Sequence, residues 1–298
     1  MGRSALLKIL VGVCACLSLG LSACGSSVLQ SVSVGEPVLY GVDYSTDAMW
    51  ERFLSEEDSY DLAEDLVGVV LPHHLVTALE LTRFYRGVSR VADPKLVVIV
   101  SPNHYEVGEA VFQTCNCSYE TFDGVDLETS GEDLEMLLLS GLVQMANENF
   151  EIEHGVYAHA NFIKRFFPEA EILPVIVKGE AGVEELDALV GYFERKYGER
   201  FGKDVLFVAS VDFAHYMTAE VSDAYDEVSF EVVAGFDYDA YWDVELDSPG
   251  SIYFVSQLAE RGGFDQVELV EHTNSQDYFQ KFVGETPSHL YITFSRGE

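Results

Sequence analysis

The sequence has few basic residues: Lys and Arg together number 17, whereas Asp and Glu number 51. The formal net charge of −34 gives a surface that repels nucleic acids and anionic lipid headgroups. We therefore exclude a nucleic-acid partner. The acidic residues are scattered along the chain and aromatic residues make up 12% of it, so the charge belongs to a folded domain and not to a disordered chain.

Several catalytic motifs are also absent. The sequence contains no glycine-rich phosphate-binding loop, no G-x-S-x-G nucleophile elbow and no H-E-x-x-H zinc motif. These absences argue against a nucleotide-binding protein, a serine hydrolase and a zincin protease as first interpretations.

The N-terminal segment, MGRSALLKILVGVCACLSLGLSAC, has a basic start, an apolar stretch and small residues before Cys24. This pattern is typical of a signal peptide and is too short for a permanent membrane span. Its L-S-A-C ending is similar to a bacterial lipobox, in which the cysteine becomes the lipid-modified first residue. We therefore expect residues 1–23 to be removed and Cys24 to anchor an exported protein to the outer face of a bacterial membrane. An ordinary cleaved signal is the alternative.

Two cysteines remain after the signal segment, Cys115 and Cys117 in the sequence Q-T-C-N-C-S. On a regular strand these side chains point to one face, and a disulfide across so small a ring would be strained. We expect two small, half-buried residues here and leave them out of the site. A soft-metal site or a redox pair is the alternative.

The rest of the chain alternates between apolar runs and amphipathic segments. The runs are continuous, as in strands that are covered on both faces, and lie at 66–71, 96–100, 172–177, 205–209 and 289–294. The segments with helical periodicity are 131–146, 182–200 and 248–263. The alternation predicts an α/β protein with three α/β/α layers around a mainly parallel, mixed sheet. We interpret residues 24–60 as a tether and acidic lead-in, and 61–298 as a single domain.

Three of the predicted strands run into histidines. His73 follows the first, His104 follows S-P-N after the second, and His215 follows S-V-D-F-A after the fourth. The carboxyl ends of parallel strands lie at one edge of an open α/β sheet, where ligands bind. Three neutral imidazoles that meet there bind a divalent transition metal. The sequence therefore predicts a metal site built from these residues.

Other polar residues lie in similar loops. Asp212 precedes His215 by three residues and could orient an imidazole or cap the next helix. Asp247 stands beside a predicted helix start and is free to reach the site. His154 and His159 are five residues apart, so a single helix would not place both on one face. Either could transfer protons or orient a ligand, and packing within a helix is the alternative.

Seven short motifs, in this order and spacing, resemble the Memo family. They are L-P-H-H-L, S-P-N-H-Y-E, I-E-H-G-V-Y-A-H, E-I-L-P-V-I-V, A-S-V-D-F-A-H-Y, D-A-Y-D-E-V and E-H-T-N-S. The resemblance covers about residue 66 to the C-terminus, and bacterial and archaeal members are called AmmeMemoRadiSam system protein B. It implies a fold similar to class III extradiol dioxygenases, which use non-haem Fe(II) at the end of an α/β sheet.

The resemblance also implies roles for individual residues. Family members hold a metal with three histidines and a cysteine, and the histidines fall on His73, His104 and His215. The histidine of the family's E-H-S motif falls on His154, which we interpret as the proton-transfer residue. Glu153, Asp212 and His159 are then expected to orient the groups of the site.

This sequence departs from the family pattern at three positions. The family cysteine falls at or near Ser248, the E-H-S serine is Gly155, and a glutamate usually found three residues after the histidine is Tyr157. Without a thiolate, and with Asp247 or water completing the set, the ligands are harder. We therefore expect Fe(II), with Zn(II) or Mn(II) as alternatives.

These features together predict a surface-anchored metalloprotein. As an enzyme it would be a non-haem, metal-dependent oxidoreductase, similar to a dioxygenase and acting on a small oxygenated substrate. Two alternatives stay open: a non-catalytic lipoprotein that binds a small molecule or peptide in the metal cleft, and a metal-dependent hydrolase.

Overall fold

The structure, a computed structural model, describes residues 34–41, 47–281, 284–285 and 287–297. The predicted signal peptide and Cys24 lie outside these residues. Within them, no helix is both long and apolar enough to cross a membrane. The described residues belong to one compact unit, and the expected boundaries of 24–60 and 61–298 stay predictions.

The strands of the described chain form two sheets. Their bounds are β1 Val38–Gly41, β2 Leu66–Leu71, β3 Leu96–Pro102, β4 Phe112–Thr114, β5 Cys117–Glu120, β6 Asp126–Glu128, β7 Gln144–Met145, β8 Glu171–Val177, β9 Val205–Ser210, β10 Gln266–Asn274 and β11 Ser288–Ser295. The larger sheet has the order β10-β11-β2-β9-β3-β8-β4-β7, and the smaller one is β1-β5-β6. The five predicted strands are β2, β3, β8, β9 and β11.

The α-helices lie between the strands along the chain. Their bounds are α1 Asp47–Leu54, α2 Ala78–Val91, α3 Gly131–Leu139, α4 Asn147–Phe150, α5 His154–Tyr157, α6 Ala160–Phe166, α7 Val183–Tyr197, α8 Ala219–Ala234 and α9 Pro249–Gly262. The three predicted helical segments contain α3, α7 and α9.

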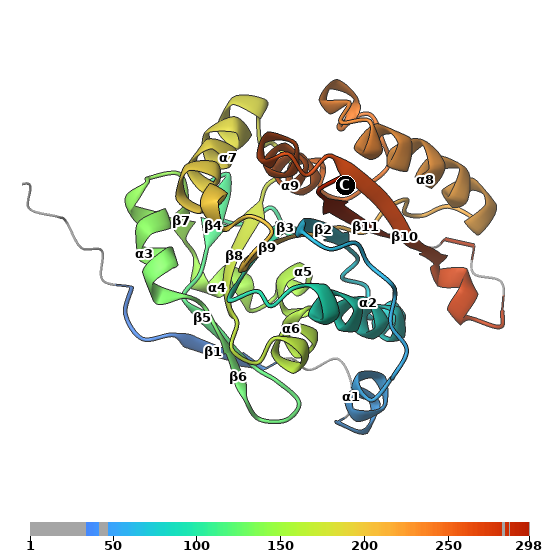
Figure 1. The fold of residues 1–298 in the computed structure, drawn as a ribbon, viewed down its shortest axis with the longest axis horizontal. Coiled ribbons are helices and arrows are strands. Elements are labelled where there is room, and N and C mark those ends of the chain that lie inside the picture. Colours follow the sequence, from blue (N-terminus) through green and yellow to red (C-terminus); the bar gives the residue numbers. More distant parts are fainter. Residues whose placement is uncertain (1–33, 42–46, 282–283, 286, 298) are drawn as a thin grey trace, which may run out of the picture. The chain divides into compact units, whose positions relative to one another are not determined.

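Helices cover both faces of the larger sheet (Figure 1). On one face, α7 and α9 pack Phe193 and Phe254 against Phe207 of β9. On the other face, α1, α2 and α6 pack against side chains such as Ile99 and Val208. Alternate residues of each buried strand therefore supply two cores, and the three-layer α/β/α prediction is confirmed.

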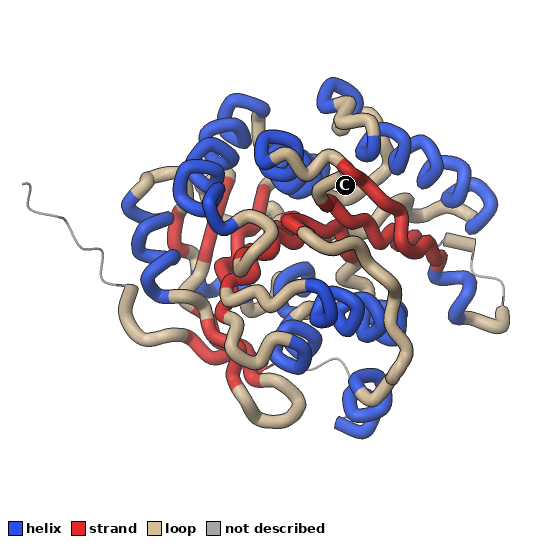
Figure 2. Tube along the Cα trace, in the orientation of Figure 1, coloured by secondary structure: helices blue, strands red, loops and turns tan. Residues whose placement is uncertain are grey.

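Four central strands, β2, β9, β3 and β8, are parallel to one another. Strand β11 runs antiparallel to β2, and β4 runs antiparallel to β8, so the sheet is mixed. Figure 2 shows the strands in red with helices in blue on both sides of them. Because the four parallel strands end at the same edge, the loops that follow them lie together.

Strand β10 forms one edge of the larger sheet and pairs antiparallel with β11. The pairing is interrupted by an irregularity between Leu269 and Glu271, as in a β-bulge. The polar residues of β10 break the apolar pattern that marks the central strands.

The smaller sheet joins the N-terminal strand β1 to β5. Cys115 and Cys117, at the passage from β4 to β5, are buried and joined by a disulfide. The two residues are thus more buried than expected, and they form the oxidised pair that the sequence left open as an alternative. The Cα atoms of the pair are 5.4 Å apart, shorter than the roughly 6.8 Å of two residues on an extended strand, because the chain leaves one sheet for the other between them.

Candidate metal centre

Three neighbouring parallel strands deliver polar side chains to one edge of the sheet. Strand β2 ends at Leu71 and β3 at Pro102, and two residues after each end come His73 and His104. Strand β9, which lies between them, ends at Ser210, and Asp212 follows at the same offset. The strand order thus brings together three residues that are far apart in the sequence.

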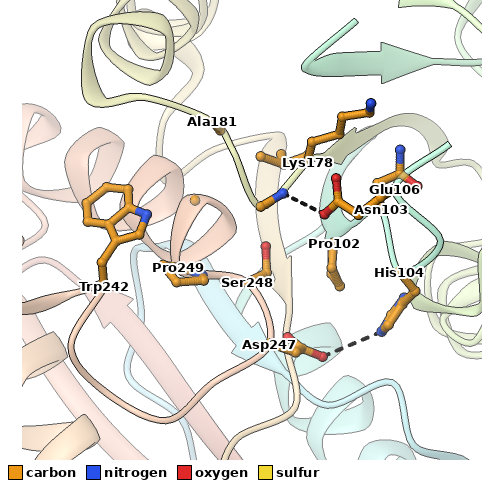
Figure 3. Close-up of a pocket in the computed structure, with 13 residues that line it drawn as sticks. Pro102, Asn103, His104, Glu106, Lys178, Ala181, Trp242, Asp247, Ser248 and Pro249 are labelled. Carbon is orange, nitrogen blue, oxygen red and sulfur yellow. Dashed lines mark hydrogen bonds and ion pairs between the residues drawn. The ribbon is translucent and has the colours of Figure 1, made fainter. Parts of the chain in front are cut away.

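Both histidines face the carboxylate of Asp247, which precedes α9. The Nε2 atom of His73 lies 3.2 Å from Asp247 Oδ2. Nε2 of His104 lies 3.6 Å from the same oxygen, a contact that Figure 3 shows. The other oxygen, Oδ1, is buried and has no hydrogen-bond partner in the described part of the chain. An unpaired buried carboxylate oxygen is costly, so these residues are suited to bind a cation.

The separations fit ligands of one ion. Metal–ligand bonds of about 2.1 Å place adjacent ligand atoms about 3.0 Å apart in octahedral and about 3.4 Å apart in tetrahedral coordination, close to the two distances to Asp247 Oδ2. His73, Asp212 and Asp247 form one group whose ligand atoms lie within 4.8 Å of one another. His73, His104 and His154 form a second such group. Buried His and Asp side chains at this edge could therefore hold a metal ion.

His154, the first residue of α5, lies beside both other imidazoles. Its ring stacks on His104 with centroids 4.1 Å apart, and its centroid is 5.0 Å from that of His73. Burial, followed by the charges of His73 and His104, lowers the pKa of His154 to about 4. At neutral pH His154 is therefore an uncharged imidazole that can accept a proton.

Two carboxylates hold the ligand loops in place. Glu153, which is buried, accepts hydrogen bonds from His104 Nδ1 at 2.6 Å and from the His104 backbone N–H at 2.9 Å. Asp212 Oδ1 accepts from the backbone N–H of His73 at 3.1 Å. Such contacts fix the direction in which an imidazole presents its other nitrogen.

Carboxylates also control the charge of the two histidines. Burial alone would lower the pKa of His104, but Asp247 and Glu153 outweigh it and raise the pKa to about 10. Burial opposes protonation of His73 as well, yet Asp212 and Asp247 raise its pKa. Burial would raise the pKa of Asp247, but His73 and His104 lower it well below its usual range. The Asp247 carboxylate is therefore ionised, and it attracts positive charge, either protons on the two histidines or a bound cation.

Two cavities open onto the centre. The smaller, about 180 Å³, lies between His104, Asp247 and the start of α9, with Trp242 in its wall (Figure 3). The larger has a volume of about 450 Å³, and its lining combines polar and apolar side chains. It is lined by His73, His74, Leu75, Val76, His154, Asp212 and Pro287. A small ligand in the larger cavity would touch His73 and His154 together.

The ligand groups found at this edge do not include His215, so its predicted role as a ligand stays a prediction. His215 is half-buried and, among the described residues, belongs to neither ligand group. It lies five residues beyond the end of β9, and hydrogen bonds from Phe213 N to Ser288 O and from Ser288 N to Ala214 O bind the preceding residues to β11. The charge of His215 contributes to the lowered pKa of His74 and of His289, so His215 lies near these two imidazoles.

The remaining predicted residues have distinct surroundings. Ser248, near the position of the family cysteine, caps α9 and its Oγ lies 2.6 Å from Ser251 Oγ. His159 is buried behind the centre, where its Nε2 lies 3.1 Å from Ser210 Oγ. Sequence reasoning missed Ser210, although a serine at the end of an apolar strand is a signal that could have found it.

A second cluster of His and Asp lies between α8 and β10. His272 Nε2 is 2.8 Å from Asp226 Oδ2 and 3.8 Å from Asp223 Oδ1. Asp226 is buried, and its Oδ1 accepts hydrogen bonds from Ser288 Oγ at 2.8 Å and from Ala214 N at 3.4 Å. Both oxygens of Asp226 are thus already paired within the protein.

Comparisons with known proteins identify relatives along most of the chain. The family model described as "Memo-like protein" matches residues 47–280. A "MEMO1 family protein" of Pyrobaculum arsenaticum is 28% identical over 247 residues, covering 79% of this chain and 85% of that protein. Another, of Pyrobaculum aerophilum, is 25% identical over 248 residues, covering 79% and 85%. Among solved structures, an uncharacterized protein from Escherichia coli K12 is 12% identical with a TM-score of 0.46, covering 77% of this chain and 99% of that one.

Proposed function

The chain belongs to the Memo-like protein family, and from this premise we propose that it is a metalloprotein with one divalent transition-metal ion between His73, His104 and Asp247. The observation that carries the proposal is the approach of two Nε2 atoms to one carboxylate, 3.2 and 3.6 Å from Asp247 Oδ2. Two histidines and one carboxylate form the ligand set of many non-haem Fe(II) enzymes. We therefore propose Fe(II) as the ion, with Zn(II) or Mn(II) as alternatives.

The protein would act as a non-haem, metal-dependent oxidoreductase on a small oxygenated molecule. When bound, Fe(II) supplies the capacity to activate dioxygen. The larger cavity holds the substrate against His73 and His154, and the neutral His154 accepts a proton from a substrate hydroxyl. Leu75, Val76 and Pro287 supply an apolar wall that excludes water from the bound molecule.

Metal analysis tests the ligand set directly. The protein without residues 1–24 is reconstituted anaerobically with Fe(II), Zn(II) or Mn(II), and the bound metal is measured. We expect one ion per chain in the wild type and loss of it in His104→Ala. His272→Ala, in the second cluster, is the matched control and retains the ion. A wild type without stoichiometric metal contradicts the proposal, and so does equal loss in both variants.

His215 receives a separate test because the resemblance and the geometry point to different roles. From its place outside both ligand groups, we expect His215→Ala to retain the metal. Loss of the ion in this variant would restore His215 as a ligand.

Turnover assays separate the enzymatic possibilities. Oxygen consumption by the Fe(II)-loaded protein with catechols supports the oxidoreductase. Ester or amide cleavage by the Zn(II)-loaded protein without oxygen supports a metal-dependent hydrolase. Thermal stabilisation by a ligand without turnover supports a non-catalytic binding protein that uses the same cavity.

We also propose that the protein is exported and anchored to the outer face of a bacterial membrane through Cys24. The lipobox-like sequence L-S-A-C supports this, as does the Cys115–Cys117 disulfide, because such bonds persist mainly outside reducing compartments. Fatty-acid labelling of cells that express the protein tests the anchor. Label that is retained in Cys24→Ala contradicts it.

A further inference from the structure

A chain of buried polar side chains extends from His73 into the interior. Ser210, His159 and Tyr85 come from β9, from the residue before α6 and from α2, and each is fully buried. The Oγ atom of Ser210 lies 3.0 Å from His73 Nδ1 and 3.1 Å from His159 Nε2. His159 Nδ1 lies 3.0 Å from the hydroxyl oxygen of Tyr85. The path therefore begins at a proposed metal ligand and ends in the core.

One contact determines which atoms along this path carry a proton. Ser210 Oγ lies 2.5 Å from the backbone carbonyl of Gly155, which can only accept a hydrogen bond. Ser210 must donate its single proton there, so its remaining contacts are as an acceptor. Two imidazole nitrogens, His73 Nδ1 and His159 Nε2, must then each carry a proton and donate it to Ser210.

The far end of the path agrees with this arrangement. With a proton on Nε2, a neutral His159 has an acceptor at Nδ1, and the Tyr85 hydroxyl donates to it. Burial lowers the pKa of His159 to about 3, so this imidazole is neutral at pH 7. Burial raises the pKa of Tyr85 well above its usual value, so the phenol keeps the proton that it donates. Each ring nitrogen on the path has one defined role.

We propose that Ser210, supported by His159 and Tyr85, is a positioning residue that holds a proton on His73 Nδ1 and thereby leaves Nε2 for the ion. The inference rests on the proposed metal site. It assigns a role to two residues, Ser210 and Tyr85, that the sequence patterns did not single out. His104 obtains the same orientation from a charged acceptor, Glu153, so the two imidazole ligands are fixed by different devices.

Nitrogen NMR of protein labelled with ¹⁵N-histidine tests the proton positions without and with Zn(II). We expect slowly exchanging N–H signals from His73 Nδ1 and His159 Nε2 in both forms, with His73 bound to Zn(II) through Nε2. The signals are assigned with His73→Gln and His159→Gln. In Ser210→Ala both signals should change together, because one hydroxyl accepts from both rings.

Zn(II) affinity measures the consequence for the site. Removing a group that orients a ligand typically weakens metal binding 10–100-fold, and we expect Ser210→Ala to fall in this range. Tyr85→Phe keeps the ring that packs on Phe162, so it should fold, change the His159 signal and weaken binding less than tenfold. The matched controls are Ser229→Ala on α8 and Tyr197→Phe on α7, which remove buried hydrogen-bonded hydroxyls elsewhere and should leave affinity within twofold.

The outcomes separate this inference from the proposed function. If the wild type binds Zn(II) but Ser210→Ala changes neither N–H signal, the positioning role is overturned and the metal site stands. If the wild type binds no metal while Ser210→Ala still changes both signals, the proton arrangement stands and the proposed function fails. Coordination of Zn(II) through His73 Nδ1 would overturn the inference as well.

Discussion

The molecule contains two clusters in which histidines face aspartates, and they differ in what remains unpaired. At the candidate metal centre, His73 and His104 both approach Asp247, whose Oδ1 has no hydrogen-bond partner among the described residues. Between α8 and β10, His272 pairs with Asp226, whose other oxygen is taken by Ser288 and Ala214. Similar residue types therefore form an open set of ligands in one place and a closed ion pair in the other.

The comparison shows that residue type and proximity do not define a metal site. Asp223, Asp226 and His272 also lie close enough to hold an ion. A ligand must offer a free lone pair. Both oxygens of Asp226 already accept hydrogen bonds, and the one from Ser288 connects α8 with β11. We therefore assign binding to the first cluster and stability to the second.

The largest effect should come from Asp247→Ala, which removes the carboxylate that both histidines face. We expect Zn(II) or Fe(II) binding to fall by more than the 10–100-fold that is typical of losing an orienting contact. Isothermal titration measures it. If this variant binds metal as tightly as the wild type, the cluster around Asp247 is not the metal site.

The second effect should come from Asp226→Ala in the closed cluster. The change leaves the Ser288 hydroxyl, the Ala214 N–H and one nitrogen of His272 unpaired, so we expect the free energy of unfolding to fall by about 2–3 kcal/mol. Urea unfolding measures the loss, and metal affinity should stay within twofold. If Asp226→Ala instead weakens metal binding and leaves the stability unchanged, the second cluster is the one that binds metal.

A smaller effect is expected for Glu153→Gln, which keeps the size of the side chain but removes the charge that faces His104. Metal affinity should fall 10–100-fold because the imidazole is held less well and is a weaker donor. Asp212→Asn probes the carboxylate beside His73 and should cost less, because the amide oxygen can still accept the hydrogen bond from the backbone N–H of His73. Equal affinity in wild type and Glu153→Gln would remove Glu153 from the site.

The smallest effect should be a pH dependence of stability in the metal-free protein. The raised pKa of His104, about 10 against an ordinary 6.5, stabilises the fold fully below pH 6.5, and this contribution is lost as the pH rises toward 10. Because solvent screens a site that opens onto two cavities, we expect on the order of 1 kcal/mol. Urea unfolding with a chelator should show the decline. Zn(II) should abolish it, and a decline that persists with Zn(II) would point to other groups, including His272.

The sequence predicted the central architecture because the buried strands are uniform. Continuous β-branched and apolar runs marked β2, β3, β8 and β9, and these four carry both cores. The short strands β4 and β7 and the small sheet were not predicted, since they hold two to four residues each with no periodicity of their own. Their pairing depends on contacts between distant segments.

The candidate site depends on a comparable regularity of the sequence. His73 and His104 follow their strands at the same offset, so the rule that strand ends meet at one edge applies to both. His215 lies farther along its loop, where hydrogen bonds to β11 decide its direction and no local pattern reveals them. At the shared offset after β9 stands Asp212, so counting residues from the strand end would have selected it over His215.

Strand β10 is an edge strand of the larger sheet, and in the described structure its outer side pairs with no other strand. Its outer backbone groups offer a template onto which a strand of another molecule could add, a hazard that proteins counter with charges and irregular backbone. This strand has both features: the charges of Glu268 and Glu271, and the irregular backbone after Leu269. The protection depends on ionised carboxylates, so self-association should be strongest near the isoelectric point of about 4.3, where like-charge repulsion between molecules disappears.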